Sequence, residues 1–483
     1  WDFFNNMAIG EFYRIAVDDS VPYRIAGGLQ DNYNWLGTSA TRSEDGITHG
    51  DWRSLGGGDG FYNVFDPTDP DIVYAESQRG RAFRLNLRTG QRRSIRPEAK
   101  EGSPGFRFHW NAPLVLSPHD PSVLYLGGNR VFRLTQKGEQ WEAISPDLST
   151  QDPARILTVG SGAETFAVVY TLAPSTIRKG LIWAGTDDGK IWLTQDDGGS
   201  WTDLTANLPK AVGGLWVSRI EASHFDAGTA YAAIDGHTSD RFAPFAMVTT
   251  DYGRSWKSIA SNLPPAGPVK VIREDLRNPD LLFAGTEFGI FASLDRGGRW
   301  LRLGYGLPTV AVDDIVIHPR DHDLVIGTHG RSIYIMDDIR ALQELTAQVA
   351  ASPTHLFSIR PALEFHLLPE GAMWSRAIYR AENPPFGAFI NYFIREFTGA
   401  DVSITVTDAA GRKVRSLTGP AAPGLNRVVW NLQPDKDPIW DFGTPSGQPR
   451  LVRPGDYTVA LSFGGVTQKQ TLRVEAVAGF EPE

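Results

Sequence analysis

The chain contains no cysteine among its 483 residues. Disulfide bonds, thiolate metal sites and a cysteine nucleophile are therefore excluded. The redox compartment stays open, because a chain without cysteine is compatible with export and with the cytosol. Long apolar runs are also missing: no stretch approaches the ~20 residues that a membrane-spanning helix needs, so we expect no membrane span.

Clusters of basic residues are absent too. Lys and Arg number 47 against 56 Asp and Glu, which gives a net charge of −9. A nucleic-acid surface needs a basic stripe, so nucleic acid is not an expected partner. The sequence opens on "WDFFNNMAIG", without an initiator Met or an apolar export segment. We expect a chain that begins at Trp1 to be a processed or truncated form.

Glycine (50), proline (32) and tryptophan (14) are frequent. This composition favours many short strands joined by tight turns. The tryptophans belong to an internal repeat. Three segments share the spacing S/T-x-D-x-G-x-x-W: "TQDDGGSWTDL" from Thr194, "TTDYGRSWKSI" from Thr249 and "SLDRGGRWLRL" from Ser293. A fourth, "LTQKGEQWEAI" from Leu134, has Gln136 in the Asp position.

This pattern is the Asp box, and its chemistry is that of a hairpin turn. The carboxylate can accept hydrogen bonds within its own turn, the glycine supplies a positive φ, and the indole packs between neighbouring sheets. We expect a structural rather than a catalytic role for these residues: Asp196, Gly198, Trp201, Asp251, Gly253, Trp256, Asp295, Gly297 and Trp300.

Each box lies in a longer unit with four predicted antiparallel strands, and such units recur every 40–55 residues or so, as propeller blades do. Seven second strands are predicted, around Ile25, Val73, Leu124, Ile182, Ala230, Leu282 and Val325. The sequence therefore predicts an all-β fold: a seven-bladed β-propeller over residues 1–340, a helical linker over 341–354 and an immunoglobulin-like β-sandwich over 355–483.

The seventh unit stops after its third strand, because "IRALQEL" looks helical where a box is expected. The opening "WDFFNN" resembles the segment that a box Trp begins, as in "SWTDLTANLP". We therefore expect residues 1–5 to supply the missing fourth strand and leave no open sheet edge. The alternative is that a missing upstream segment, or another chain, fills this edge.

Several phrases look like one bacterial family: "GGLQDN", "AESQRG", "VIREDLRNPDLLFAGTEFG" and "IGTHGRSIYIMDDI". It is the sortilin-like, or BNR-repeat, "glycosyl hydrolase" family, and the resemblance covers nearly the whole chain. It implies an exported protein, secreted, periplasmic or on the bacterial cell surface. It also implies an N-terminal propeller half of the same precursor as a partner. No catalytic residue carries over by motif.

Blade geometry predicts the functional face. Turns between second and third strands, and loops from a fourth strand to the next first strand, share the face opposite the Asp boxes. The ligand-binding candidates on it are Asp31, Asn32, Arg79, Trp110, Asn111, Asp188, His237, Arg241, Phe288, His329 and Arg331. Glu164 is expected on the same face.

Two functions compete for this face. In the first, it binds a protein, peptide or glycan, with aromatic side chains stacking and arginines pairing with carboxylates. In the second, two carboxylates hydrolyse a glycosidic bond, and Asp59, Asp187 and Glu287 are the candidates. No cofactor is predicted. "HPRDHD" resembles a metal-ligand cluster, but it occupies the same turn slot as "DPTDPD", so no metal site is predicted.

Overall fold

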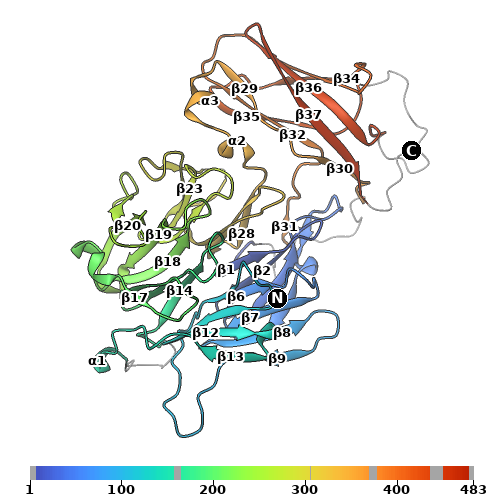
Figure 1. The fold of residues 1–483 in the computed structure, drawn as a ribbon. Coiled ribbons are helices and arrows are strands. Elements are labelled where there is room, and N and C mark those ends of the chain that lie inside the picture. The colour runs from blue at the N-terminus through green and yellow to red at the C-terminus, as the bar shows by residue number, and fades with distance from the viewer. Residues whose placement is uncertain (1–6, 157–164, 305, 369–377, 436–449, 478–483) are drawn as a thin grey trace, which may run out of the picture.

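The computed structural model describes residues 7–156, 165–304, 306–368, 378–435 and 450–477. Seven antiparallel sheets follow one another along the first part of the chain (Figure 1), and each is a simple meander. Their first strands contact one another, as those of the fourth and fifth sheets and of the fifth and sixth sheets do, and are therefore innermost. The predicted fourth strand over residues 1–5, Glu164 and most of the proline-rich loop after Gln433 lie outside the described residues.

Six sheets have four strands each. The first contains β1 (Phe12–Val17), β2 (Arg24–Leu29), β3 (Asn34–Thr38) and β5 (Arg53–Gly56); the second β6 (Gly60–Phe65), β7 (Ile72–Ser77), β8 (Arg81–Asn86) and β9 (Arg92–Ser94); the third β10 (Leu114–Leu116), β11 (Leu124–Gly127), β12 (Val131–Thr135) and β13 (Gln140–Ala143). The fourth contains β14 (Val169–Pro174), β15 (Ile182–Thr186), β16 (Ile191–Thr194) and β17 (Thr202–Asp203); the fifth β18 (Trp216–Ala222), β19 (Ala230–Gly236), β20 (Arg241–Thr249) and β21 (Lys257–Ser258); the sixth β22 (Val269–Glu274), β23 (Leu282–Thr286), β24 (Gly289–Ser293) and β25 (Leu301–Arg302).

The seventh sheet has three strands within the described part of the chain: β26 (Ala311–Ile317), β27 (Leu324–His329) and β28 (Ile333–Met336). All seven predicted second strands are thus confirmed, as β2, β7, β11, β15, β19, β23 and β27.

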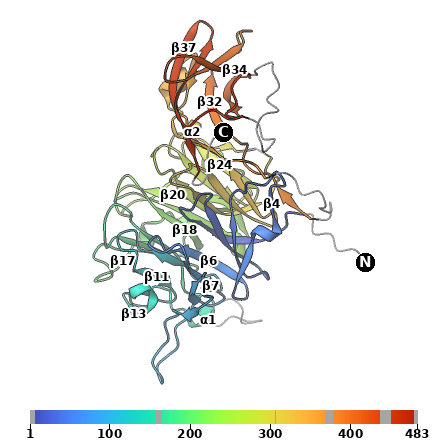
Figure 2. The same ribbon diagram turned by 90° about the vertical axis from the view of Figure 1, so that its right-hand side faces the viewer.

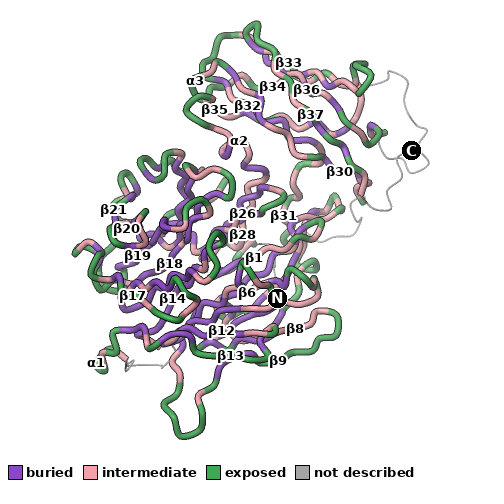
Figure 3. The backbone as a smooth tube through the Cα atoms, in the orientation of Figure 1, coloured by how far each residue is buried: buried purple, intermediate pink, exposed green. Residues whose placement is uncertain are grey.

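The sheets form a closed ring because an apolar core lies between each sheet and the next. Between the fourth and fifth sheets, for example, Trp183 packs with Val217 and Ile220. The ring closes where Phe12 and Ile15 of the first sheet pack with Val325 of the seventh. The inner strands β1 and β26 are also in direct contact. Figure 3 shows buried backbone throughout the ring, and the second strands β15, β19 and β23 are buried at every residue. The architecture is that of a β-propeller.

Two short helices follow the ring, α2 (Arg340–Gln343) and α3 (Ala347–Ala351). The helical linker predicted over 341–354 is thus divided between two short helices and is not one continuous helix. The chain breaks at Thr346, whose hydroxyl accepts a hydrogen bond from the N–H of Val349 and caps a new helix. A further short helix, α1 (Pro153–Ile156), precedes the fourth sheet.

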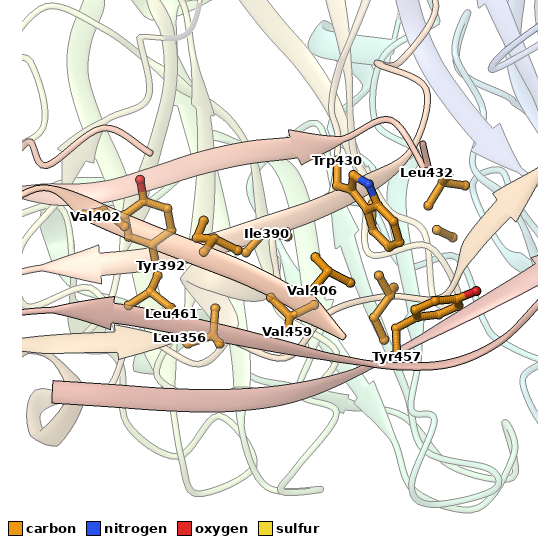
Figure 4. Packing of buried hydrophobic residues seen from close by; sticks show 14 of the residues in the cluster. Leu356, Ile390, Tyr392, Val402, Val406, Trp430, Leu432, Tyr457, Val459 and Leu461 are labelled. Carbon is orange, nitrogen blue, oxygen red and sulfur yellow. The ribbon is translucent and has the colours of Figure 1, made fainter. Parts of the chain in front are cut away.

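The C-terminal part consists of two facing sheets. One contains β29 (Thr354–Leu356), β32 (Ala388–Ile394) and β35 (Gly424–Trp430); the other contains β30 (Ala362–Glu364), β37 (Val466–Ala476), β36 (Gly455–Phe463), β33 (Val402–Thr407) and β34 (Lys413–Gly419). Figure 4 shows their shared core, where Trp430 and Tyr392 of the first sheet meet Val459 and Tyr457 of the second. The predicted hairpins at Ala410-Gly411 and Gly464-Gly465 join β33 to β34 and β36 to β37.

The sandwich stands at the rim of the ring beside the seventh and first sheets (Figure 2). Arg360 forms an ion pair with Asp323, and Arg427 donates to the carbonyl oxygens of residues 337 and 338. A two-stranded sheet of β4 (Ile47–Thr48) and β31 (Arg380–Ala381) adds a main-chain connection.

Candidate functional site

The inner strands of five sheets share one irregularity. Each strand shifts register against its neighbour by one residue near its start, so that one residue is left outside the ladder. The residues that the shifts skip are Tyr13, Tyr170, Ser218, Lys270 and Asp313. In the second sheet the shift spans Phe61 and Tyr62. Because the seven inner strands surround the central channel, these bulges place side chains of different chemistry at one end of it. We call this end the mouth.

Aromatic rings form one side of the mouth. The ring of Tyr170 lies 4.8 Å from that of His109 and 4.7 Å from that of Trp216, both edge to face. Trp216 also stacks with His237 at 6.2 Å. The indole N–H of Trp216 is shielded from solvent and has no hydrogen-bond partner among the described residues. Burial lowers the pKa of His109 to about 3, so this ring is neutral.

Charged groups form a continuous chain next to these rings. Nδ1 of His237 lies 2.7 Å from the Asp235 carboxylate, whose other oxygen lies 2.9 Å from Nζ of Lys270. Lys270 in turn lies 3.3 Å from Glu287. Burial opposes ionisation of Asp235, but the hydrogen bond from His237 and the charge of Lys270 together lower its pKa to about 2. The carboxylate of Asp235 is therefore ionised across the physiological range.

His329 belongs to a second charged group, on the seventh sheet. Its Nδ1 lies 3.3 Å from the Asp313 carboxylate, and its Nε2 lies 3.9 Å from Glu11. The neighbouring carboxylate of Asp313 raises the pKa of His329 above its ordinary value, although burial opposes the shift. The ring of Tyr13 lies 5.5 Å away.

Asp59 organises the opposite side of the mouth. One carboxylate oxygen accepts the N–H of Asp31 at 2.8 Å, and the other accepts the indole N–H of Trp110 at 3.1 Å. The guanidinium of Arg79 lies 6.0 Å from the Trp110 ring, a cation–π arrangement. Two of the predicted ligand-binding residues, Asp31 and Trp110, thus meet at one carboxylate, and a third, Arg79, lies over the Trp110 ring.

Arginines lie deeper in the channel. Arg14 is 5% exposed; one Nη donates to two main-chain oxygens and the other to the Tyr170 hydroxyl. Arg219 and Arg273 both pair with the Asp314 carboxylate, at 2.8 and 3.1 Å. This carboxylate also accepts the N–H of Ile15, so it ties the first, fifth, sixth and seventh sheets together.

The remaining predicted ligand-binding residues lie around the mouth but differ in what they contact. Asn111 donates to the Tyr170 hydroxyl and is buried. Both oxygens of Asp188 are taken by threonine groups, which indicates a role in the loop rather than in recognition. The others, on turns between second and third strands or at the start of β20, are Asn32, Arg241, Phe288 and Arg331. Of these, Phe288 is a large apolar side chain that is 41% exposed.

Two of the three carboxylate candidates for hydrolysis are engaged, whereas Oδ2 of Asp187 is buried without a hydrogen-bond partner among the described residues. Asp59 holds the loops of Asp31 and Trp110, and Glu287 pairs with Lys270. Asp187 is 3% exposed and accepts the N–H of Val168 at 2.9 Å. Burial, together with the neighbouring charge of Asp188, raises the pKa of Asp187 well above its ordinary value.

The repeat turns lie at the opposite ends of the sheets. In each, the Asp carboxylate accepts the Ser or Thr hydroxyl two residues earlier and an N–H four residues later, as Asp295 does from Ser293 and Arg299 at 2.7 and 2.8 Å. The glycines have φ of +93°, +78° and +87°. The Trp300 indole donates to the carbonyl of Ile259 in the preceding sheet at 2.6 Å. These contacts are structural.

Sequence reasoning missed the bulge residues and the buried arginines. The predicted candidates were loop residues, whereas these side chains lie within strands; in "VKVIRE", for example, Lys270 has the position of an ordinary solvent-facing residue of an alternating strand. In the described residues, no group of three His, Asp or Glu side chains is arranged to hold a metal ion. No described helix has both the length and the apolarity to cross a membrane.

Comparison with known proteins gives information on the fold alone. No family model and no curated protein sequence matches the chain. Among solved structures, it is similar to the GH74 xyloglucanase from Xanthomonas campestris, with a TM-score of 0.51 and 18% identity over 72% of this chain and 54% of that one. This likeness supports a β-propeller fold of the kind found in glycoside hydrolases.

Two further structures match less well. A GH74 enzyme from Niastella koreensis has a TM-score of 0.36 and 16% identity over 67% of this chain and 56% of that one. PorZ, a surface component of the type-IX secretion system of Porphyromonas gingivalis, has a TM-score of 0.44 and 14% identity over 98% of this chain and 60% of that one. The chain therefore covers between 54% and 60% of the length of these three structures.

Proposed function

We propose that this chain is a binding module that recognises a peptide, protein or glycan at the mouth of its channel. In this proposal, the sheets are the blades of a seven-bladed Asp-box propeller of the sortilin-like, BNR-repeat type, and the C-terminal sandwich is immunoglobulin-like. The protein is exported and acts at or beyond the bacterial cell surface, together with an N-terminal propeller half of its precursor.

One observation carries the binding function. The mouth brings together stacked aromatic rings and an alternating chain of charges, with the unpartnered indole N–H of Trp216 among them. A buried N–H without a partner costs free energy, and a ligand acceptor that bonds to it removes this cost. Aromatic faces with a few placed polar groups are typical of ligand sites.

The state of the carboxylates argues for binding over hydrolysis. A glycosidase needs two acids that face the scissile bond, one as proton donor and one as base or nucleophile. The oxygens of Asp59 hold two loops, and Asp187 is buried against Val168. The raised pKa of Asp187 favours a proton donor, and this keeps hydrolysis as the second candidate.

The test compares mouth variants of the full chain against two probes, xyloglucan oligosaccharides and a library of unstructured peptides. Trp216→Ala removes the central ring, and Trp141→Ala is the matched control, because Trp141 is 40% exposed on the outer strand β13. We expect Trp216→Ala to weaken any binding tenfold or more by titration calorimetry, and Trp141→Ala to leave it unchanged. Binding that is indifferent to Trp216 contradicts the proposal.

Hydrolysis is checked in the same samples. New reducing ends from the polysaccharide that disappear in Asp187→Asn establish the second candidate instead. Asp203→Asn is the control, because Asp203 lies on the outer strand β17, where it pairs with Lys190.

A further inference from the structure

Arg14 is a buried charge without a counter-charge. It extends from the inner strand β1, is 5% exposed, and its guanidinium lies 5.2 and 5.6 Å from the ring centres of Tyr62 and Tyr170. The nearby carboxylates of Asp313 and Asp314 pair with other side chains, and no carboxylate of a described residue lies within ion-pair distance of Arg14. Because an arginine stays protonated, burying it without an ion pair costs free energy.

Glu76 is close enough to Arg14 to feel its charge but does not balance it. The side chain of Glu76 is 0% exposed, and one of its oxygens accepts the N–H of Gly80 at 3.0 Å. Burial raises the pKa of Glu76 well above its ordinary value, although main-chain hydrogen bonds and the charge of Arg14 oppose the shift. This carboxyl group is therefore neutral, and the charge of Arg14 remains uncompensated.

Two further arginines leave the channel with a surplus of positive charge. Arg219, which is 5% exposed, and Arg273 share one oxygen of Asp314 at 2.8 and 3.1 Å. Arg273 also pairs with Glu221 at 2.7 Å. Burial opposes ionisation of Glu221, but the charge of Arg273 lowers its pKa to about 2. The three arginines of the channel thus face two ionised carboxylates, and one positive charge is left over.

Hydrogen-bond donors without partners lie beside this surplus charge. The Nε–H groups of Arg14 and Arg219 have no partner among the described residues. The Tyr170 hydroxyl accepts one bond from Arg14 and one from Asn111, each 3.3 Å long, and donates to no described residue. Burial and, after it, the charge of Arg14 lower the pKa of Arg219, so the two guanidiniums are close enough to repel each other. An anion near both would offset this repulsion and accept charge-assisted hydrogen bonds.

We propose that the channel binds one monovalent anion, a halide or a small carboxylate, between Arg14, Arg219 and Tyr170. A single negative charge balances the surplus of one positive charge. The ion would connect the first, fifth and fourth sheets, to which these three residues belong, as Asp314 connects the first, fifth, sixth and seventh. The inference goes beyond the proposed function and does not depend on it, because the ion binds whether or not a ligand occupies the mouth.

Hydrogen exchange of the full chain at two chloride concentrations tests the proposal. An ion that binds only the folded ring slows exchange of the β1 and β18 amides in proportion to the filling of its site. For a site half-filled at about 30 mM, raising sodium chloride from about 10 to about 300 mM slows exchange roughly eightfold, and we expect at least fivefold.

The matched variants separate a specific ion from general screening by salt. We expect Arg14→Gln to reduce the chloride effect to twofold or less. Arg254→Gln also removes one positive charge, but Arg254 is exposed in the turn after β20, so this variant is expected to keep the full effect. Equal slowing in Arg14→Gln, or no slowing in wild type, overturns the proposal.

Tyr170→Phe gives an independent test should Arg14→Gln fail to fold, because it preserves the charges of the channel. Loss of one donor to the ion is expected to raise the chloride concentration for half of the effect at least threefold, and an unchanged titration overturns the proposal. Sodium acetate then distinguishes the two kinds of anion. Slowing equal to that by chloride identifies a site that also takes small carboxylates, and slowing by chloride alone identifies a halide site.

Bromide locates the ion. In crystals of the full chain soaked in sodium bromide, we expect an anomalous-scattering peak within hydrogen-bond distance of Arg14 and of the Tyr170 hydroxyl. A channel without this peak overturns the proposal. A peak without the chloride effect in solution shows an adventitious ion only, and this outcome overturns it as well.

Discussion

We predict that the C-terminal sandwich loses stability as pH rises, because of the buried residue Glu364. Its side chain is 0% exposed at the end of β30, and neither carboxylate oxygen has a hydrogen-bond partner in the described structure. Burial raises its pKa from 4.5 to about 7. Such a group is tolerated as a neutral acid and becomes costly once it ionises.

The direction in which stability changes with pH depends on whether the folded or the unfolded chain binds more protons. Between pH 4.5 and about 7 the folded chain holds a proton on Glu364 that the unfolded chain releases. The folded state binds more protons, so the free energy of unfolding falls as pH rises through this window. The loss is about 2 kcal/mol once screening by nearby solvent is allowed for. Glu364→Gln cannot ionise and escapes this loss.

The assay is urea unfolding of the full chain at pH 5 and pH 8, together with hydrogen exchange of the β36–β37 amides so that the sandwich is observed separately. The control is Glu475→Gln, on the neighbouring strand, because Glu475 is exposed and faces solvent. We expect the free energy of unfolding of Glu364→Gln, relative to that of wild type, to rise by about 2 kcal/mol between pH 5 and pH 8. For Glu475→Gln we expect this difference to stay constant. Equal pH dependence in wild type and Glu364→Gln refutes the reasoning.

Three further predictions concern the ring, and urea unfolding of the full chain measures each. Asp314→Asn leaves two buried arginines without their shared counter-charge and is expected to cost about 3–5 kcal/mol; a cost below about 1 kcal/mol contradicts the role assigned to this carboxylate. Trp300→Phe loses the indole hydrogen bond to the preceding sheet and should cost about 1–3 kcal/mol. Gly28→Ala places a Cβ 2.1 Å from the main chain of Phe61 and should destabilise strongly, whereas a Cβ at Gly105 meets nothing within 4 Å and Gly105→Ala should be neutral.

The ring was predictable from the sequence because its determinants are local and repeated. Apolar alternation gave the strands, and the spacing of Asp, Gly and Trp gave the turns, since each turn is held by bonds within a few residues, such as Asp251 to Ser255. The linker was predicted less well. A single residue, Thr346, divides it into two helices, and a cap of this kind competes with a helical pattern that looks continuous.

The candidate site was predicted only at its rim. Loop residues such as Trp110 and Asp59 were placed on the correct turns, but their hydrogen bond joins two different loops and depends on tertiary structure. The strand residues were missed because a bulge adds one residue without changing composition. Lys270 within "VKVIRE" looks like the exposed position of an alternating strand, yet it points into a chain of charges.

The bulges explain how a ring of similar sheets obtains a mouth of varied chemistry. In four sheets the residue before the bulge is a valine that is fully buried, and it anchors the strand in the ring: Val169, Val217, Val269 and Val312. The next residue is excluded from the ladder, so it is free to vary without disturbing the pairing on either side. The excluded residue differs from sheet to sheet: it is Tyr170, Ser218, Lys270 or Asp313. The repeat therefore fixes the position of this residue, and its identity sets the chemistry that each sheet contributes near the mouth.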